Sequence, residues 1–226
     1  MITTHTEEEQ KQKQQKEEQK KEQKEEEFIQ TWWNENIKSE DNVFYNWICD
    51  SEALTKVYAR KHIIQKQYKS ILDVGCANAT MFYGFRNDKY TIDYTGIDSC
   101  KYLVKKNINN DINVILGNVN RTIFKDSLFD VVFSRHIVEH QPTCEPLLLE
   151  TIRIAKKEVI HIFFKKPHHS TSTPHIINYE KTSNLYHNTY SSFLIEYLLS
   201  HHQKVNKFTW NDISNDECVL HIILHS

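Results

Sequence analysis

The stretch SILDVGCANAT, residues 70–80, decides the fold. Its first five residues form a short apolar run that is typical of a buried strand, and Gly75 follows directly where that run ends. Glycine lets the backbone turn tightly and approach a ligand closely, and Ala77 and Ala79 are the next smallest residues. The stretch therefore predicts a strand, a tight turn and the beginning of a helix.

Four similar apolar runs follow, with helical patterning between them. They are YTIDYTGID (90–98), INVILGN (112–118), LFDVVFS (128–134) and EVIHIFF (158–164). Apolar strands that alternate with helices indicate a parallel sheet that is covered on both faces. A helix over residues 190–202 and two strand candidates, KVNKFTW and CVLHIILH, complete the chain. We therefore predict an α/β fold of the Rossmann-like, doubly wound type.

Residues 7–27 differ from the rest of the chain because they contain only Glu, Lys and Gln. All three residue types favour helices, but no apolar residue is present to form a coiled-coil seam. We therefore divide the chain into a charged tail over residues 1–27, either a solvated helix or disordered, and a folded domain over residues 28–226. The alternative is that residues 7–27 bind a protein partner.

Aromatic residues just after the tail allow two interpretations. Trp32, Trp33, Tyr45 and Trp47 are expected to close one end of the core. They would otherwise line a cofactor pocket, since aromatic rings stack on adenine and attract cations. Both interpretations place these rings against the folded domain.

The composition excludes several classes of protein. A net charge of −2 gives no basic surface that would announce a nucleic-acid partner. The five cysteines are odd in number and include no CxxC pair, so neither a disulfide framework nor a zinc knuckle is indicated. No stretch approaches the ~20 apolar residues of a membrane span. The first residues do not read as a signal peptide, so we expect a cytoplasmic protein.

The stretch SRHIVEH, residues 134–140, contains a His-x-x-Glu-His motif, which in some proteases binds zinc. A zinc site of this kind needs a continuous helix that directs both histidines to one side. Here the motif follows a predicted strand directly, and Pro142 disfavours helix at the residue before it. We therefore expect a loop or one short turn, and no metal site. The histidines of the polar loop after residue 164 fit no compact ligand set either.

Two classes of cofactor suit such a strand-turn-helix unit. Asp98 ends the second predicted strand, where a carboxylate can accept hydrogen bonds from ribose hydroxyls. A nicotinamide-binding turn would read G-x-G-x-x-G, but Ala77 and Thr80 follow Gly75 at those positions. Asp73 would face a pyrophosphate unfavourably and suits a cationic ligand. S-adenosylmethionine carries a sulfonium and an ammonium and no phosphate, so the residues favour the methyl donor.

With these motifs the chain resembles the class I S-adenosylmethionine-dependent methyltransferases. ILDVGCANAT, YTGIDSC, VILGNV and FDVVFSRHIVEHQP are similar, in order and spacing, to successive motifs of that family, in the manner of methyltransferase domains of types 11 and 25. The resemblance covers about residues 40–226 and implies a mostly parallel, seven-stranded sheet with helices on both faces. It also implies methyl transfer by direct displacement to an unidentified acceptor, either a small molecule or a macromolecule.

The resemblance implies a donor site at the carboxyl ends of the first four strands. Its residues would be Asp73, Gly75, Cys76, Ala77, Asp98, Ser99, Asn118, Val119, Ser134 and Arg135. Asp73, Gly75, Cys76 and Ala77 would hold the methionine part. Asp98 and Ser99 would hold the ribose, and Asn118 and Val119 the adenine. Ser134 and Arg135 would border donor and substrate. His136 is the candidate catalytic base, because imidazole titrates near neutral pH.

Two other functions stay open. Ala77 and Ala79 stand where members of that family usually have glycine. If these alanines prevent donor binding, the chain would be a non-catalytic, methyltransferase-like scaffold. An NAD-dependent oxidoreductase is the other alternative, and Asp73 and Thr80 disfavour it.

Overall fold

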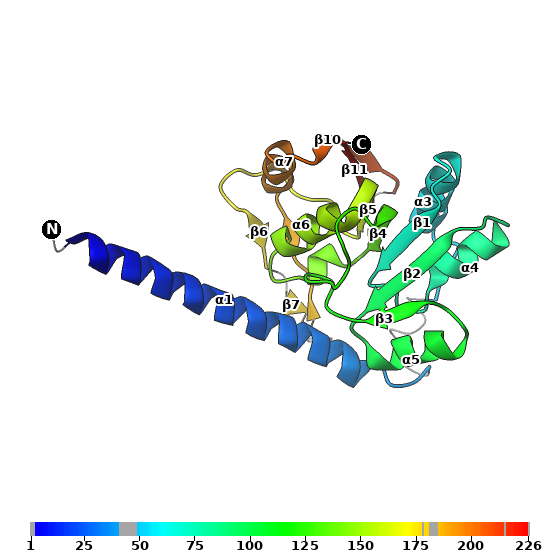
Figure 1. Ribbon diagram of the computed structural model, residues 1–226, viewed down its shortest axis with the longest axis horizontal. Helices are drawn as coiled ribbons and strands as arrows, with labels where there is room; N and C mark the ends of the chain where they lie inside the picture. The colour runs from blue at the N-terminus through cyan, green and yellow to red at the C-terminus, as the bar shows by residue number, and fades with distance from the viewer. Residues whose placement is uncertain (1–2, 41–48, 178, 181–184, 215, 226) are drawn as a thin grey trace.

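A single seven-stranded sheet forms the centre of the domain. The computed structural model describes residues 3–40, 49–177, 179–180, 185–214 and 216–225. The strand order is β10-β11-β5-β4-β1-β2-β3 (Figure 1). The strands are β1 (Ser70–Val74), β2 (Asp93–Asp98), β3 (Val114–Leu116), β4 (Phe129–Arg135), β5 (Ala155–Phe163), β10 (Val205–Asp212) and β11 (Cys218–Leu224). Strands β1 to β5 pair in parallel, whereas β11 is antiparallel to both β5 and β10. The predicted Rossmann-like sheet is confirmed.

Helices cover both faces of this sheet. The helices are α3 (Leu54–Gln65), α4 (Thr80–Asn87), α5 (Lys101–Asn109), α6 (Glu145–Ile154) and α7 (Ser192–Ser200). Alternate residues of β1 enter two separate cores: Leu72 packs in one with side chains of α6 and α7, and Ile71 in the other with side chains of α3, α4 and α5. This double burial explains why the strand sequences are almost continuously apolar.

Some element boundaries differ from the sequence prediction. β5 begins at Ala155 instead of residue 158, because α6 ends at Ile154 and the chain enters the strand directly. Two short strand pairs in the polar loop after β5 were not predicted. They are β6 (His175–Ile176) with β9 (Thr189–Tyr190), and β7 (Tyr179–Glu180) with β8 (Leu185–Tyr186).

One long helix, α1 (Thr3–Asn36), leads into the domain, and its N-terminal part extends away from the body (Figure 1). Wherever side chains are described between residues 9 and 27, they are exposed. Ile29, Trp32 and Ile37 are buried, so the last turns of α1 and the residue after it pack on the domain. Among the described helices, none is both long and apolar enough to cross a membrane.

Asn34 attaches the end of α1 to the segment between β2 and α5. Its side-chain Nδ2 donates to the Ser99 carbonyl at 2.9 Å, and its Oδ1 accepts from the Lys101 amide at 2.8 Å. Helix α1 is continuous across the predicted boundary at residue 27. Two of the aromatic residues discussed above, Tyr45 and Trp47, lie outside the described residues.

Candidate functional site

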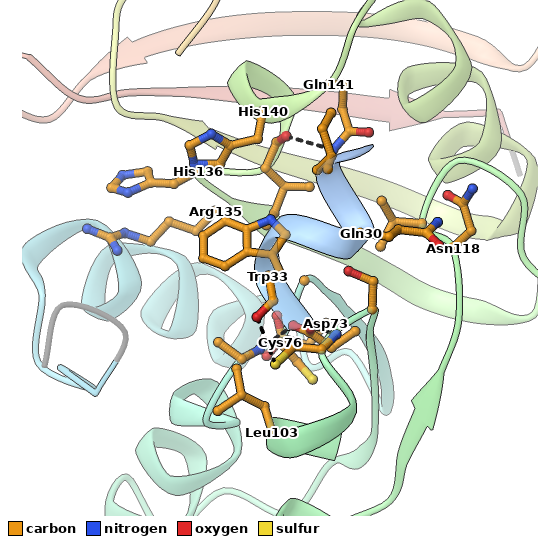
Figure 2. Close-up of a pocket in the computed structure, with 18 of the residues that line it drawn as sticks. Gln30, Trp33, Asp73, Cys76, Leu103, Asn118, Arg135, His136, His140 and Gln141 are labelled. Atoms are coloured by element: carbon orange, nitrogen blue, oxygen red, sulfur yellow. Dashed lines mark hydrogen bonds between the residues drawn. The ribbon is translucent and has the colours of Figure 1, made fainter. Parts of the chain in front are cut away.

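A cavity of about 210 Å³ opens at the carboxyl ends of β1, β2 and β4 (Figure 2). Most of the residues implied by the sequence motifs line it together: Asp73, Gly75, Cys76, Ala77, Asp98, Ser99, Asn118, Val119, Arg135 and His136. Further lining residues come from α1 and α3. Ligands of doubly wound sheets bind at this edge.

Ser134 does not line the cavity, unlike the expectation from sequence. Its neighbours in β4, Phe133 and Arg135, do so. Side chains of a strand alternate between the two faces, so Ser134 points the other way. It is fully buried, and its Oγ lies 2.6 Å from Nδ1 of His161.

The turn after β1 has a left-handed backbone at several positions. φ is 68° at Gly75, 46° at Ala77 and 52° at Ala79. A Cβ atom at position 75 would displace the end of the Ile137 side chain, and the positive φ there favours glycine. The two alanines adopt positive φ without that freedom, which is an unfavourable conformation for them. The turn is therefore held in shape by its surroundings.

Asp98 is the main support of this turn. Its Oδ2 accepts from the Ala77 amide at 2.9 Å, and its Oδ1 accepts from the Cys100 amide at 2.8 Å. Burial raises the pKa of Asp98, and the backbone amides oppose that effect. Each carboxylate oxygen has further lone pairs, so Asp98 can still accept hydrogen bonds from a ligand in the cavity.

Asp73 and Lys56 place two side chains with pKa values near neutral pH in the cavity wall. Tyr94 donates its hydroxyl to Asp73 at 2.7 Å, and burial raises the pKa of Asp73 to about 7. Lys56, from α3, donates to Thr80 Oγ1 and to the Asp50 carbonyl, both at 2.7 Å. Burial, together with the positive charge of Arg135, lowers the pKa of Lys56 to about 8. Both groups titrate close to neutral pH, so a bound charge will change their protonation.

His136 is held by Glu217, which the motifs did not reveal. The ring Nε2 lies 2.5 Å from Glu217 Oε1, and Arg135 Nη2 donates to the same oxygen at 2.7 Å. Burial raises the pKa of Glu217, but the hydrogen bond from His136 and the charge of Arg135 outweigh it and bring that pKa to about 2. Burial lowers the pKa of His136. The pair is therefore an ionised carboxylate beside a neutral imidazole at pH 7.

The His-x-x-Glu-His motif forms one short turn, as predicted. Residues Val138–His140 are a 3-10 turn after β4. Glu139 turns inward, where its Oε1 accepts from the Phe164 amide at 2.6 Å and burial raises its pKa to about 8. His136 turns instead toward Glu217. In the described part of the chain, the motif does not form a group of convergent metal ligands.

The end of α1 forms one wall of the cavity. Ile29, Gln30, Trp33 and Ile37 are among the lining residues. The Trp33 ring meets the His140 ring edge to face, with centroids 5.6 Å apart (Figure 2). Trp33 thus follows the pocket-lining interpretation, while Trp32 follows the core interpretation.

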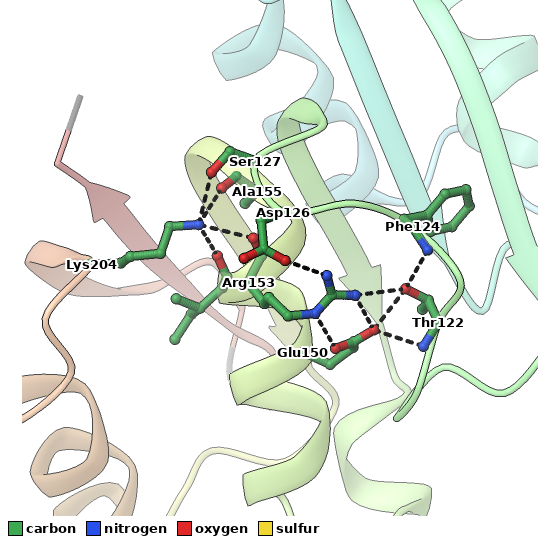
Figure 3. A network of polar contacts seen from close by, with 9 residues as sticks. Thr122, Phe124, Asp126, Ser127, Glu150, Arg153, Ala155 and Lys204 are labelled. Atoms are coloured by element: carbon green, nitrogen blue, oxygen red, sulfur yellow. Dashed lines mark hydrogen bonds and ion pairs between the residues drawn. The ribbon is translucent and has the colours of Figure 1, made fainter.

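A polar network holds the loop between β3 and β4, which carries Asn118 and Val119 to the cavity (Figure 3). Glu150 accepts from both the amide and the hydroxyl of Thr122 at 2.7 Å, and Arg153 bonds to Glu150 and to Asp126. Sequence patterns gave no signal for this network, because its members are common surface residue types.

Lys204 ties the far end of the same loop to α6 and β5. Its Nζ donates to Ser127 Oγ at 3.1 Å, and to the carbonyls of Ile152 and Arg153 at 2.9 Å and of Ala155 at 3.0 Å (Figure 3). The loop is therefore fixed on both sides.

Comparisons with known proteins relate part of the chain to a methyltransferase domain. Residues 72–163 match the sequence model of a methyltransferase domain family. That segment runs from β1 to the end of β5 and includes most of the cavity lining. No curated protein matches the chain by sequence.

Solved structures share the fold. Magnesium protoporphyrin IX methyltransferase from Synechocystis, with bound S-adenosylhomocysteine, gives a TM-score of 0.58 at 11% identity, covering 83% of this chain and 90% of that one. A Burkholderia thailandensis 1,6-didemethyltoxoflavin N1-methyltransferase, with bound 1,6-didemethyltoxoflavin and S-adenosylhomocysteine, gives a TM-score of 0.57 at 11% identity. The match covers 77% of this chain and 80% of that one. A complex of a methyltransferase activator with a presumed methyltransferase from Haloferax volcanii gives a TM-score of 0.57 at 12% identity. The match covers 81% of this chain and 96% of that one. At these identities the likeness concerns the fold alone.

Proposed function

We propose that this chain, which belongs to the class I S-adenosylmethionine-dependent methyltransferase family, binds S-adenosylmethionine in the cavity and transfers its methyl group to an acceptor. The observation that supports this most is the meeting of Gly75, Asp98 and Asn118 in one cavity at the carboxyl edge of the sheet. Gly75 follows β1, Asp98 ends β2 and Asn118 lies after β3, and each has the chemistry that one part of the donor needs.

The donor would lie across the ends of β1, β2 and β3. Its methionine part would meet the backbone of the Gly75 turn, with Asp73 near the ammonium. The ribose hydroxyls would donate to Asp98, and the adenine amino group to the side-chain oxygen of Asn118. Trp33 supplies an aromatic surface beside these groups.

Methyl transfer needs alignment more than chemical activation, because the sulfonium methyl is already reactive. The cavity walls would hold nucleophile, methyl carbon and leaving sulfur in line. A base is needed only if the acceptor arrives protonated. His136 would then accept that proton, and Glu217 would act as a positioning residue that fixes its ring.

Calorimetric titration of the purified chain tests the proposal. S-adenosylmethionine and S-adenosylhomocysteine are each titrated, with NAD as the matched control because it shares the adenosine but carries a pyrophosphate. We expect micromolar binding of the two sulfur compounds and none of NAD. Failure of both sulfur compounds to bind would overturn the proposal and favour a non-catalytic scaffold.

The exposed part of α1 is the region that we assign to a protein partner. Its charged side chains are not used by the domain wherever they are described. The solved Haloferax volcanii structure with a similar fold is a complex with a methyltransferase activator. Deleting residues 1–27 should then abolish partner binding and leave donor binding intact. Partner binding that survives the deletion would overturn this assignment.

A further inference from the structure

A group of potential metal ligands lies outside the cavity. His62, Glu158 and His221 each offer one ligand atom, and these atoms all lie within 4.8 Å of one another. His62 Nε2 is 2.9 Å from Glu158 Oε2, and His221 Nδ1 is 2.6 Å from Glu158 Oε1. They come from α3, β5 and β11, so only the fold brings them together.

The sheet register fixes two of the three ligands. In the antiparallel pair of β5 and β11, His221 lies opposite Ile160 and Ile223 lies opposite Glu158. Glu158 and His221 are therefore diagonal neighbours on one face of the sheet. His62 approaches that face from α3, which packs over it.

Neighbouring side chains orient these ligands, as the outer groups of metal sites do. Tyr68 donates its hydroxyl to Glu158 Oε2 at 2.7 Å. The Tyr58 hydroxyl lies 3.2 Å from Nε2 of His221 and in turn accepts from Asn211 Nδ2 at 3.0 Å. With Nε2 engaged by Tyr58, Nδ1 is the nitrogen of His221 that faces the group.

The charge at this point calls for a cation. The side chain of Glu158 is 0% exposed, and among the described residues its ion-pair partners are the two histidines. A buried carboxylate without a fixed positive partner is costly. Imidazole nitrogen and carboxylate oxygen are together the ligands that Zn²⁺ takes, whereas Mg²⁺ prefers oxygen alone.

We propose that His62, Glu158 and His221 bind one Zn²⁺ ion. The ligand atoms of a tetrahedral zinc site lie roughly 3.3 Å apart, given metal–ligand distances of about 2.0–2.2 Å. The two nitrogen–oxygen distances of 2.9 and 2.6 Å, and the 4.8 Å within which all three ligand atoms lie, are on either side of that spacing. The His62 side chain is 22% exposed, which provides the entry path and room for a water molecule as fourth ligand.

The ion would clamp α3 to the sheet. Lys56, six residues before His62 on the same helix, lies in the cavity wall. Glu158 is near the beginning of β5, whereas the cavity opens at the other end of the parallel strands. We therefore infer a structural role for the ion, separate from the transfer reaction.

The test uses the full chain after removal of metal with a chelator. Zn²⁺ binding is measured by competition with a chromogenic chelator, and thermal unfolding is followed with and without Zn²⁺. We expect one tightly bound equivalent, a higher unfolding temperature, and a visible Co²⁺ spectrum of four-coordinate type. Mg²⁺ should neither bind tightly nor raise the unfolding temperature.

His62→Gln is the deciding variant, because this partly exposed residue can be replaced without opening the core. It should weaken Zn²⁺ binding at least tenfold and abolish the rise in unfolding temperature. His201→Gln, at the end of α7, is the matched control and should bind as the unchanged chain does. The proposal fails if no equivalent binds, or if His62→Gln binds Zn²⁺ as tightly as the control. The latter would place the ion among the other histidines.

Discussion

Nε2 of His136 lies 2.5 Å from Oε1 of Glu217, although the two residues are 81 positions apart in the chain. Glu217 precedes β11 directly, so the C-terminal hairpin, and not a methyltransferase motif, orients the candidate base. When the ionised carboxylate accepts a hydrogen bond from Nε2–H, the lone pair of the neutral ring is on Nδ1. The contact therefore selects the tautomer in which Nδ1 can accept a proton.

Replacing Glu217 by Gln should lower the pKa of His136 further below its ordinary value. Burial and the charge of Arg135 already lower this pKa, and Glu217 opposes them. Removing the anion destabilises the imidazolium, so the pKa of His136 should decrease. A histidine NMR titration measures it, with His136→Gln used to identify the signal.

Glu196→Gln is the control for this experiment. Glu196 accepts from Trp210 and does not contact His136, so its replacement should leave the titration unchanged. In an enzyme assay the acidic limb of the pH profile should move to lower pH in Glu217→Gln, because the base stays neutral further into the acid range. An unchanged or raised pKa would contradict the orienting role of Glu217.

Asp98→Ala should weaken S-adenosylhomocysteine binding by roughly 1–3 kcal/mol, as buried donors lose their acceptor. The variant should also unfold at lower temperature, because the Ala77 and Cys100 amides lose their hydrogen bonds. Calorimetry and thermal unfolding measure the two effects. Asp93→Ala, at the exposed beginning of β2, should change neither. Unchanged affinity in a folded Asp98→Ala protein would mean that this carboxylate does not bind the ribose.

The two parts of α1 should differ in their effect on donor binding. Deleting residues 1–27 should leave the affinity for S-adenosylhomocysteine within about twofold, since the described side chains there are exposed. Trp33→Ala should weaken it by about tenfold, because the ring lines the cavity and its loss opens that wall to water. The same calorimetric titration compares them. Equal affinities in the two variants would show that α1 contributes nothing to the site.

Local patterns predicted the part of the site that lies close in sequence. The Gly75 turn and Asp98 follow directly from strands, and strand ends of a parallel sheet meet at one edge. Pro142 correctly indicated that the His-x-x-Glu-His stretch is a short turn. Ser134 was placed wrongly because its motif was read without the alternation of side chains along β4.

Most long-range contacts left no trace in the sequence. The aromatic ring of Trp33 allows a pocket-lining interpretation but does not select it over burial in the core. Lys56 and Glu217 reach the cavity region from α3 and the C-terminal hairpin, and neither belongs to a recognisable motif. The same holds for the His62, Glu158 and His221 group, whose members are 96 and 63 positions apart along the chain. Only the sheet order determines which of these residues become neighbours.

Binding of S-adenosylmethionine at pH 7 should release protons. The pKa of Asp73 is about 7 without a ligand, so roughly half of the molecules carry a proton there. A sulfonium and an ammonium nearby favour the carboxylate and also lower the pKa of Lys56, so both groups lose protons on binding. The affinity should therefore rise as the pH increases from about 5.5 to 8. Calorimetry in buffers of different ionisation enthalpy counts the protons released.

S-adenosylhomocysteine and Asp73→Asn provide the two controls. The product lacks the sulfonium charge and should release fewer protons than the donor. Asp73→Asn removes the titrating carboxyl but can still accept the Tyr94 hydroxyl through its amide oxygen, so the release should fall to the part contributed by Lys56. Proton uptake, or equal release from the unchanged chain and from Asp73→Asn, would show that the donor's positive charge does not lie beside Asp73.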